Sequence, residues 1–200
     1  MAALAVLASA GGCGDDEEPP AEAPAPRAAK VPVERLREGG YVVVFRHAAT
    51  DTGMDTTDDL RDCSRQRNLN AEGRRQSREI GRAFERLGIP VGRVLASPFC
   101  RTRDTARIAF GRARPSRALL SVEFFANPRE GRREGLRRLL EAEPAAGTNT
   151  VLVSHGSAIF EAMERDPDEG EAVIVEPGRG GRGFTVEAAV TAGEWRRLER

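Results

Sequence analysis

The sequence predicts an α/β fold of three layers, with helices on both faces of a mostly parallel central sheet. Short valine-rich apolar runs alternate with longer amphipathic segments, and this alternation favours parallel strands joined by helices. The first run, Tyr41–Phe45, contains only apolar residues, which is typical of a strand buried on both faces. At 200 residues the chain is long enough for one domain with a sizeable core.

Strands are predicted where β-branched and aromatic residues gather. Five segments qualify: Tyr41–Phe45, Val91–Ala96, Asn149–Ser154, Ala172–Val175 and Phe184–Val190. The segment Leu119–Phe125 is either a strand or a loop. The polar, acidic stretch 48–67 has neither a helical nor a strand period, so we expect a long loop there, and such loops in compact domains are usually functional or disordered.

The clearest helix is predicted over residues 71–87. Its apolar residues recur at the spacing of one helix face, Asn70 can cap its start, and Gly88 can end it. Shorter helices are predicted over three further segments: 102–110, the leucine stripe around 136–140, and 157–163.

The first thirty residues differ in composition from the rest. Residues 1–13 hold a short apolar run that cannot span a bilayer but fits the apolar part of a signal peptide. Small residues lead into Cys13, as in a bacterial lipoprotein signal, although no basic residue precedes the run. Residues 14–30 form an acidic, Pro/Ala-rich tract that cannot bury enough apolar surface to fold. We expect a disordered tether there, followed by one folded domain over residues 31–200.

Two locations follow from these alternatives. If Cys13 is lipidated, the protein is exported and attached to the outer face of a bacterial membrane. If the first thirty residues are only a disordered tail with an incidental cysteine, the protein is cytoplasmic. An exported protein would also allow Cys63 and Cys100 to form a disulfide that pins the 48–67 loop. The alternative is that Cys100 is a buried free thiol.

The balance of charges makes nucleic acid an improbable partner. The chain has 31 basic and 31 acidic residues and therefore no net charge. Lys30 is its only lysine, so the other basic residues are arginines. The arginine fork matches the oxygens of phosphate and carboxylate groups bidentately.

Polar residues follow three of the predicted strands at the point where each strand ends. These are Arg46-His47, Ser97-Pro98 with Arg101 one turn later, and Ser154-His155. Parallel strands bring their carboxyl ends to one edge of the sheet, where α/β proteins bind ligands. Both histidines of the chain and two arginines would then share one pocket.

Such a pocket is predicted to bind an anion. Arginines would repel a cation, so metal ligation by the two histidines is disfavoured and we predict neither a metal nor a cofactor. A serine–histidine triad also fits poorly, because the Gly-x-Ser-x-Gly elbow is absent from the sequence. A histidine among arginines can act as a nucleophile toward phosphorus, since neighbouring positive charge lowers its pKa and keeps it neutral.

Four sequence motifs resemble those of the histidine phosphatase superfamily, in its phosphoglycerate-mutase-like branch. They are Arg46-His47, Leu69-x-x-x-Gly73-x-x-Gln76, Ser97-Pro98-x-x-Arg101-x-x-x-Thr105-Ala106 and Val153-Ser154-His155-Gly156. The resemblance implies a phosphoglycerate-mutase-like fold and a phosphohistidine mechanism. In it His47 is the nucleophile, and Arg46, Arg101 and His155 bind the phosphoryl group.

The chain departs from the family pattern beside the nucleophile. Ala48 stands where the family usually has glycine, and no glutamate follows it. The proton donor of the family is a glutamate between the second and third motifs, which makes Glu123 the candidate here. Its apolar neighbours would raise its pKa. The alternative is an exposed strand carboxylate, with Glu130 and Asp166 as weaker candidates for the donor.

Two further residues have an open role. Arg67 could reach the remainder of the substrate, or it could pair with the acidic loop. Ser154 could hold His155 or a phosphate oxygen, or it could satisfy only the backbone at a strand end.

The function predicted from all of this is a metal-independent phosphomonoester hydrolase that forms a phosphohistidine on His47. Its substrate would be a small phosphate ester or another phosphorylated molecule. A phosphotransferase or mutase of the same fold and a non-catalytic phosphate-binding domain remain as alternatives.

Overall fold

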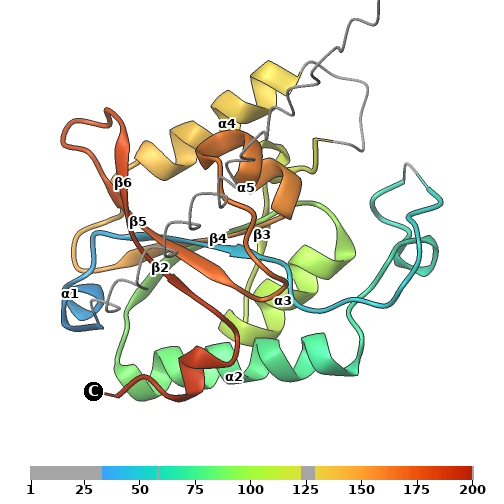
Figure 1. Ribbon diagram of the computed structural model, residues 1–200, viewed down its shortest axis with the longest axis horizontal. Helices are drawn as coiled ribbons and strands as arrows, with labels where there is room; N and C mark the ends of the chain where they lie inside the picture. Colours follow the sequence, from blue (N-terminus) through green and yellow to red (C-terminus); the bar gives the residue numbers. More distant parts are fainter. Residues whose placement is uncertain (1–32, 58, 123–128, 200) are drawn as a thin grey trace, which may run out of the picture.

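The computed structural model describes residues 33–57, 59–122 and 129–199 (Figure 1). The predicted signal segment and tether lie outside the described residues, and so does Glu123. The strands are β1 (Val42–Arg46), β2 (Val91–Ala96), β3 (Arg114–Pro115), β4 (Asn149–Ser154), β5 (Ala172–Pro177) and β6 (Phe184–Val190). The helices are α1 (Val33–Glu38), α2 (Ala71–Leu87), α3 (Cys100–Phe110), α4 (Arg129–Glu141) and α5 (Gly156–Met163).

The six strands form one sheet in the order β3-β2-β4-β1-β5-β6. The first four are mutually parallel, whereas β5 runs antiparallel to β1 and β6 antiparallel to β5. A short hairpin joins β5 to β6, and a hairpin can join only antiparallel strands. The predicted α/β class and mostly parallel sheet are therefore confirmed, with an antiparallel extension at one edge.

The sheet separates two apolar cores, and the side chains of β1 alternate between them. Val43 and Phe45 face the core formed with α1, α2 and α3, while Val42 and Val44 face the one formed with α4 and α5. Figure 1 shows α2 and α3 on one side of the sheet and α4 and α5 on the other. All four side chains are at most 1% exposed. The uninterrupted apolar run that predicted this strand is thus the consequence of a sheet covered on both faces.

Both ends of α2 follow the predicted signals. The Asn70 side chain accepts a hydrogen bond from the Gly73 amide (2.9 Å), which satisfies one of the free N–H groups of the first turn. Gly88 ends the helix with φ of 67°, a left-handed conformation in which glycine has no steric cost. Among the described residues, no helix is long and apolar enough to cross a membrane.

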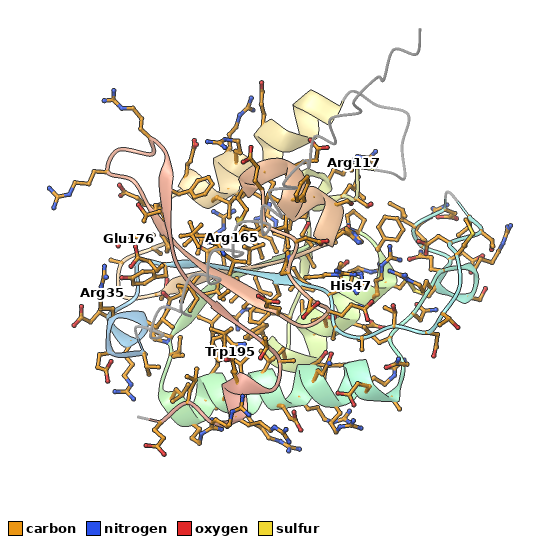
Figure 2. The ribbon with its side chains drawn as sticks, viewed as in Figure 1. Arg35, His47, Arg117, Arg165, Glu176 and Trp195 are labelled. Atoms are coloured by element: carbon orange, nitrogen blue, oxygen red, sulfur yellow. A yellow bond between two sulfur atoms is a disulfide. The ribbon has the colours of Figure 1, made fainter. Side chains whose placement is uncertain are left out.

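The last part of the chain closes the core under β1. Trp195, in a short 3₁₀ turn, is fully buried, and its ring lies 6.0 Å from Phe45 and 4.9 Å from Phe84. Figure 2 shows it between the sheet and α2. Aromatic pairs at such separations add to the free energy gained from burial. The β1 strand, which leads directly into His47, therefore rests on an aromatic cluster.

Helices α2 and α3 approach each other closely because Gly81 has no side chain. A Cβ atom at this position would collide with the main chain of Ala109 in α3. Helix–helix contacts of this kind cannot accept a methyl group unless the helices separate.

We predict that Gly81→Ala lowers the free energy of unfolding by about 1–3 kcal/mol, although alanine alone favours a helix over glycine. Denaturant unfolding would measure this. Glu85→Ala, on the exposed face of α2, is the matched control and should change stability by no more than about 0.5 kcal/mol. A Gly81→Ala protein as stable as the parent would show that the helices are not in such close contact.

Candidate active site

The parallel strands bring the two histidines together. Arg46 of β1 pairs with Ser154 of β4, and the His47 amide donates to the Ser154 carbonyl (3.0 Å). His47 and His155 therefore leave the sheet side by side, with ring centroids 5.6 Å apart. The Ser97 amide continues the β2–β4 ladder by donating to the Val153 carbonyl (3.0 Å), so the third strand ends at the same edge. Figure 2 shows His47 at this edge of the sheet.

The imidazole of His47 is held in one tautomer. Its Nδ1 lies 2.9 Å from the Ala48 carbonyl oxygen, which can only accept a hydrogen bond, so Nδ1 carries the proton. The lone pair of the ring is then on Nε2. The pKa of His47 is lowered to about 3, mainly by burial and in addition by the positive charges of Arg101, Arg67 and Arg46. The hydrogen bond to Ala48 opposes this shift. The ring is neutral over the physiological range.

The backbone after His47 is fixed by two of the motif residues seen in the sequence. The Ala48 amide donates to the Thr105 hydroxyl (3.1 Å), and the Ala49 amide donates to the Gln76 side-chain oxygen (2.9 Å). Gly73 packs so closely on the Ala49 main chain that a Cβ there would collide with it. Gln76 of α2 and Thr105 of α3 thus hold in place the backbone around Ala48, whose carbonyl sets the tautomer of His47.

His155 is held from both of its ring nitrogens. Its Nε2 lies 2.9 Å from the Ser97 hydroxyl, and its Nδ1 lies 3.5 Å from Nη2 of Arg101. A guanidinium can only donate, so Nδ1 accepts and Nε2 carries the proton. Burial lowers the pKa of His155 well below its ordinary value, and Arg101 and His47 add to this effect. Ser97 was a motif residue in the sequence, but its contact with His155 was not predicted.

Three arginines line the same cavity as the two histidines. The cavity has a volume of about 500 Å³, and Arg46, Arg67 and Arg101 contribute to its wall. Arg46 donates through Nη1 to the Pro167 carbonyl (2.9 Å). The Nε atoms of Arg46 and Arg101 are buried and have no hydrogen-bond partner among the described residues. Buried donors of this kind are costly unless a ligand or water accepts from them.

Acidic residues stand close to these arginines. Asp166 lies 3.6 Å from Arg46 Nη1 and is largely exposed at the cavity wall. Glu169 lies 3.8 Å from His47 Nδ1 and accepts a hydrogen bond from the Thr50 hydroxyl (2.8 Å). Asp55 pairs with Arg101 at 3.0 Å. Neither Asp55 nor Glu169 was predicted as a site residue, because both come from loops without a periodic pattern.

The predicted site residues are not all placed in the same way. The cavity wall includes Arg46, His47, Arg67, Arg101 and His155, together with three residues that were not predicted to be there: Ser121, Ser157 and Phe160. Ser154 does not line it. Its hydroxyl donates to the Leu119 carbonyl (2.9 Å), which is the strand-end role given above as the alternative.

Arg67 contributes to the cavity wall and also contacts the acidic loop. Its side chain lines the cavity, while its backbone amide donates to Asp55 of the acidic loop (2.9 Å). Asp166, the weaker candidate for the proton donor, also lines the cavity, whereas the placement of Glu123 is not described. Among the described residues, no group of three or more His, Cys, Asp or Glu side chains could hold a metal ion.

Comparison with known proteins agrees with this geometry. Residues 42–130 match the family model of the histidine phosphatase superfamily (branch 1). No curated protein sequence matched the chain. Among solved structures, the protein histidine phosphatase SixA complexed with tungstate is 18% identical with a TM-score of 0.56, and the match covers 77% of this chain and 98% of that one.

A second solved structure, a mutant phosphoserine phosphatase from Entamoeba histolytica in complex with phosphoserine, is 13% identical with a TM-score of 0.51. That match covers 76% of this chain and 97% of the other. At these identities the structures show a shared fold. The family model covers somewhat less than half of the chain, and this part contains the Arg46-His47 and Ser97–Arg101 motifs. Over these residues the chain is similar to the histidine phosphatase superfamily (branch 1).

Proposed function

We propose that the protein is a metal-independent phosphomonoester hydrolase that works through a phosphohistidine on His47. The observation that carries this proposal is the pair of buried, unpartnered Nε donors on Arg46 and Arg101 around a neutral histidine. Donors in that position match the equatorial oxygens of a phosphoryl group and stabilise charge that develops on them. The superfamily contains phosphatases and mutases, so a phosphotransfer reaction is the common chemistry.

The reaction follows from the tautomer of His47. The Nε2 lone pair attacks phosphorus, the bond from phosphorus to the ester oxygen breaks, and the leaving alcohol takes a proton from an acidic side chain. We propose Glu123 for that role, on its place between the second and third motifs, with Asp166 as the alternative at the cavity wall. Water then attacks phosphorus, the phosphorus–nitrogen bond breaks, and the carboxylate accepts the proton of the water.

Positive charge for this chemistry comes from side chains. Arg46, Arg101 and, at a greater reach, Arg67 surround the position of the phosphoryl group, and His155 sits beside Arg101. We propose that these groups make a divalent ion unnecessary. A small phosphate ester would fit a cavity of about 500 Å³.

We also propose that the protein is exported and anchored through a lipidated Cys13. The disulfide between Cys63 and Cys100 supports an oxidising compartment, because disulfides rarely persist in a reducing cytoplasm. Detergent partitioning of the full chain and of Cys13→Ser tests the anchor. The full chain should enter the detergent phase and the variant should stay in the aqueous phase, and equal partitioning would refute the anchor.

The first test of the reaction is His47→Ala with an aryl phosphate as substrate. We predict that kcat falls by roughly 10⁴-fold or more, because the nucleophile is lost, while tungstate binding and the folded state remain. Arg101→Lys should lower kcat/KM by about 10²-fold, because an ammonium does not replace a fork. Acid-quenched enzyme should carry a phosphoryl group on histidine in the parent only.

Two results would contradict this scheme. One is activity that survives His47→Ala, and the other is activity that a chelator removes and a divalent ion restores. Oxyanion binding by the parent without any turnover would instead support the non-catalytic alternative.

A second prediction concerns the neutral histidines. In the folded protein the pKa of His47 is about 3, whereas in the unfolded chain it is near 6.5, so the unfolded chain binds more protons between these values. Lowering the pH from 6.5 toward 3 therefore destabilises the fold, by about 1.4 kcal/mol per pH unit for one such group. The stability conferred by a neutral His47 is complete above pH 6.5.

Denaturant unfolding between pH 7 and 4.5 measures this effect. The slope of stability against pH should be shallower in His47→Gln and in His155→Gln than in the parent, because the proton uptake on unfolding is then smaller. Carboxylates contribute equally to all three proteins. An unchanged slope would show that His47 is already protonated in the folded state at these pH values.

A further inference from the structure

The acidic loop after His47 places one carboxylate against the arginines of the cavity. Both oxygens of Asp55 lie near Nη1 of Arg101, at 3.0 and 3.1 Å. One of them also accepts a hydrogen bond from the backbone amide of Arg67 (2.9 Å). The Asp55 carboxylate therefore contacts two of the three arginines of the site. It accepts hydrogen bonds from the side chain of Arg101 and from the backbone amide of Arg67. The Arg101 side chain is 5% exposed and that of Asp55 is 18% exposed, so solvent screens this ion pair little.

These contacts fix the direction of the Arg101 guanidinium. Its Nη1 is used by Asp55 and by the Arg67 carbonyl (3.4 Å), and its flat face lies over the Phe99 ring, 4.3 Å from the centroid. The Nη2 atom faces His155, and Nε has no partner among the described residues. With one end of the fork held, the opposite edge, Nε and Nη2, is the pair of donors left for a bidentate oxyanion.

The position of Asp55 depends on a covalent link to the same helix that carries Arg101. The Thr56 amide donates to the Arg65 carbonyl (2.9 Å), and the Arg65 side chain donates back to the Thr56 carbonyl (2.7 Å), so the two arms of the loop are paired. Two residues before Arg65, Cys63 forms a disulfide with Cys100, with Cα atoms 5.7 Å apart.

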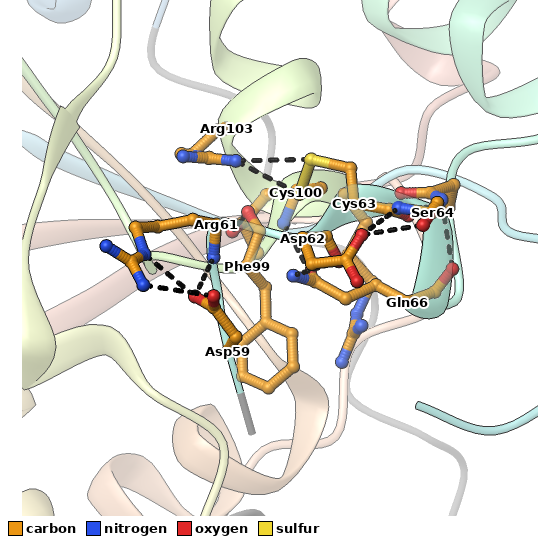
Figure 3. The surroundings of a disulfide bond; sticks show 12 residues. Asp59, Arg61, Asp62, Cys63, Ser64, Gln66, Phe99, Cys100 and Arg103 are labelled. Carbon is orange, nitrogen blue, oxygen red and sulfur yellow. Dashed lines mark hydrogen bonds and ion pairs between the residues drawn. A yellow bond between two sulfur atoms is a disulfide. The ribbon is translucent and has the colours of Figure 1, made fainter. Parts of the chain in front are cut away.

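Figure 3 shows the disulfide with Arg103 and Gln66 around it. The Arg103 guanidinium lies 3.0 and 3.3 Å from the two sulfurs, and the Gln66 side chain accepts a hydrogen bond from the Cys100 amide (2.9 Å) at the start of α3. The disulfide from Cys63 and the hydrogen bond from Gln66 therefore both tie the base of the loop to Cys100, the first residue of α3. Because Arg101 directly follows Cys100 in the chain, a movement of Cys100 also shifts the backbone of Arg101.

From this arrangement we infer that Asp55 is a positioning residue for Arg101, and that the Cys63–Cys100 disulfide keeps it in place. The inference deepens the proposed function, because it rests on Arg101 being an oxyanion ligand. Asp55 does not touch the reacting atoms in this scheme. It acts through Arg101 and through the backbone of Arg67.

The direction in which the affinity for an anion changes shows whether Asp55 positions Arg101 or competes with the anion for it. Removing the negative charge of Asp55 should, on electrostatic grounds alone, strengthen binding of an anion. If Asp55 positions Arg101, Asp55→Asn should instead weaken tungstate binding by about 10-fold, measured by titration calorimetry. Asp59→Asn is the matched control, because Asp59 pairs with Arg61 on the same loop and does not line the cavity (Figure 3). Tighter binding by Asp55→Asn, or an equal loss in the control, would overturn the inference.

A double-mutant cycle distinguishes positioning from a general loss of structure. With Arg101 changed to Lys, the fork that Asp55 holds is gone, so Asp55→Asn should cost much less binding than in the parent. A purely structural role would lower the unfolding temperature in both backgrounds and give additive losses. Additive losses in tungstate affinity would overturn the inference.

The disulfide is tested by reduction and by Cys63→Ser/Cys100→Ser. A mild reductant should weaken tungstate binding by the parent several-fold and leave the double variant, which is weakened already, unchanged. Asp55→Asn should then cost less in the double variant than in the parent. If reduction leaves the affinity of a folded parent unchanged, the disulfide has no part in positioning.

Tungstate binding also separates this inference from the proposed hydrolysis. A parent that binds tungstate but releases no phosphate from an ester would refute the hydrolysis and leave the role of Asp55 measurable. A parent that binds no tungstate would overturn both.

Discussion

The hydrogen-bonded register between β1 and β4 is the constraint on which the site depends. It pairs Arg46 with Ser154, so that His47 and His155 leave the sheet at neighbouring positions. The same ladder extends to Ser97 beyond β2. A shift of one residue in either strand would turn every side chain to the opposite face and would separate the two histidines. Close packing of β1 in both cores opposes that shift, because Phe45 and the valines of β1 would have to exchange places in cores that fit side chains of different size.

This arrangement gathers positive charge in a buried place, which is energetically unfavourable. Three arginines and two buried rings share one cavity, and burial lowers the pKa of Arg101, His47 and His155, which disfavours their charged forms. The protein offsets this cost with carboxylates supplied by loops, at Arg46 and Arg101, and with neutral histidines. The site is therefore held together by contacts to partners far apart in the sequence, whereas its reacting groups come from strand ends.

This division explains which parts were predictable. The segments Val91–Ala96, Asn149–Ser154 and Phe184–Val190 were predicted with their observed bounds, because β-branched residues gather in each of them. Helix α1 and strand β3 were not predicted, since six and two residues are too short to show a period. Parallel topology was enough to predict that His47, His155 and Arg101 converge. The partners Asp55 and Glu169 could not be found in the same way, because nothing in an irregular loop indicates which of its carboxylates folds inward.

The reversal of direction at β5 has a consequence for how this fold can vary. Because β5 is antiparallel to β1, its first residue, Ala172, lies beside Phe45 at the end of the sheet that carries the site. The connection from α5 must therefore return over that edge, where Asp166 and Pro167 contact Arg46 and Glu169 lies near His47. The hairpin between β5 and β6 emerges at the opposite end (Figure 1). Insertions in that hairpin would therefore leave the pocket unchanged. An insertion between α5 and β5 would instead change a wall of the pocket and with it the specificity for a substrate.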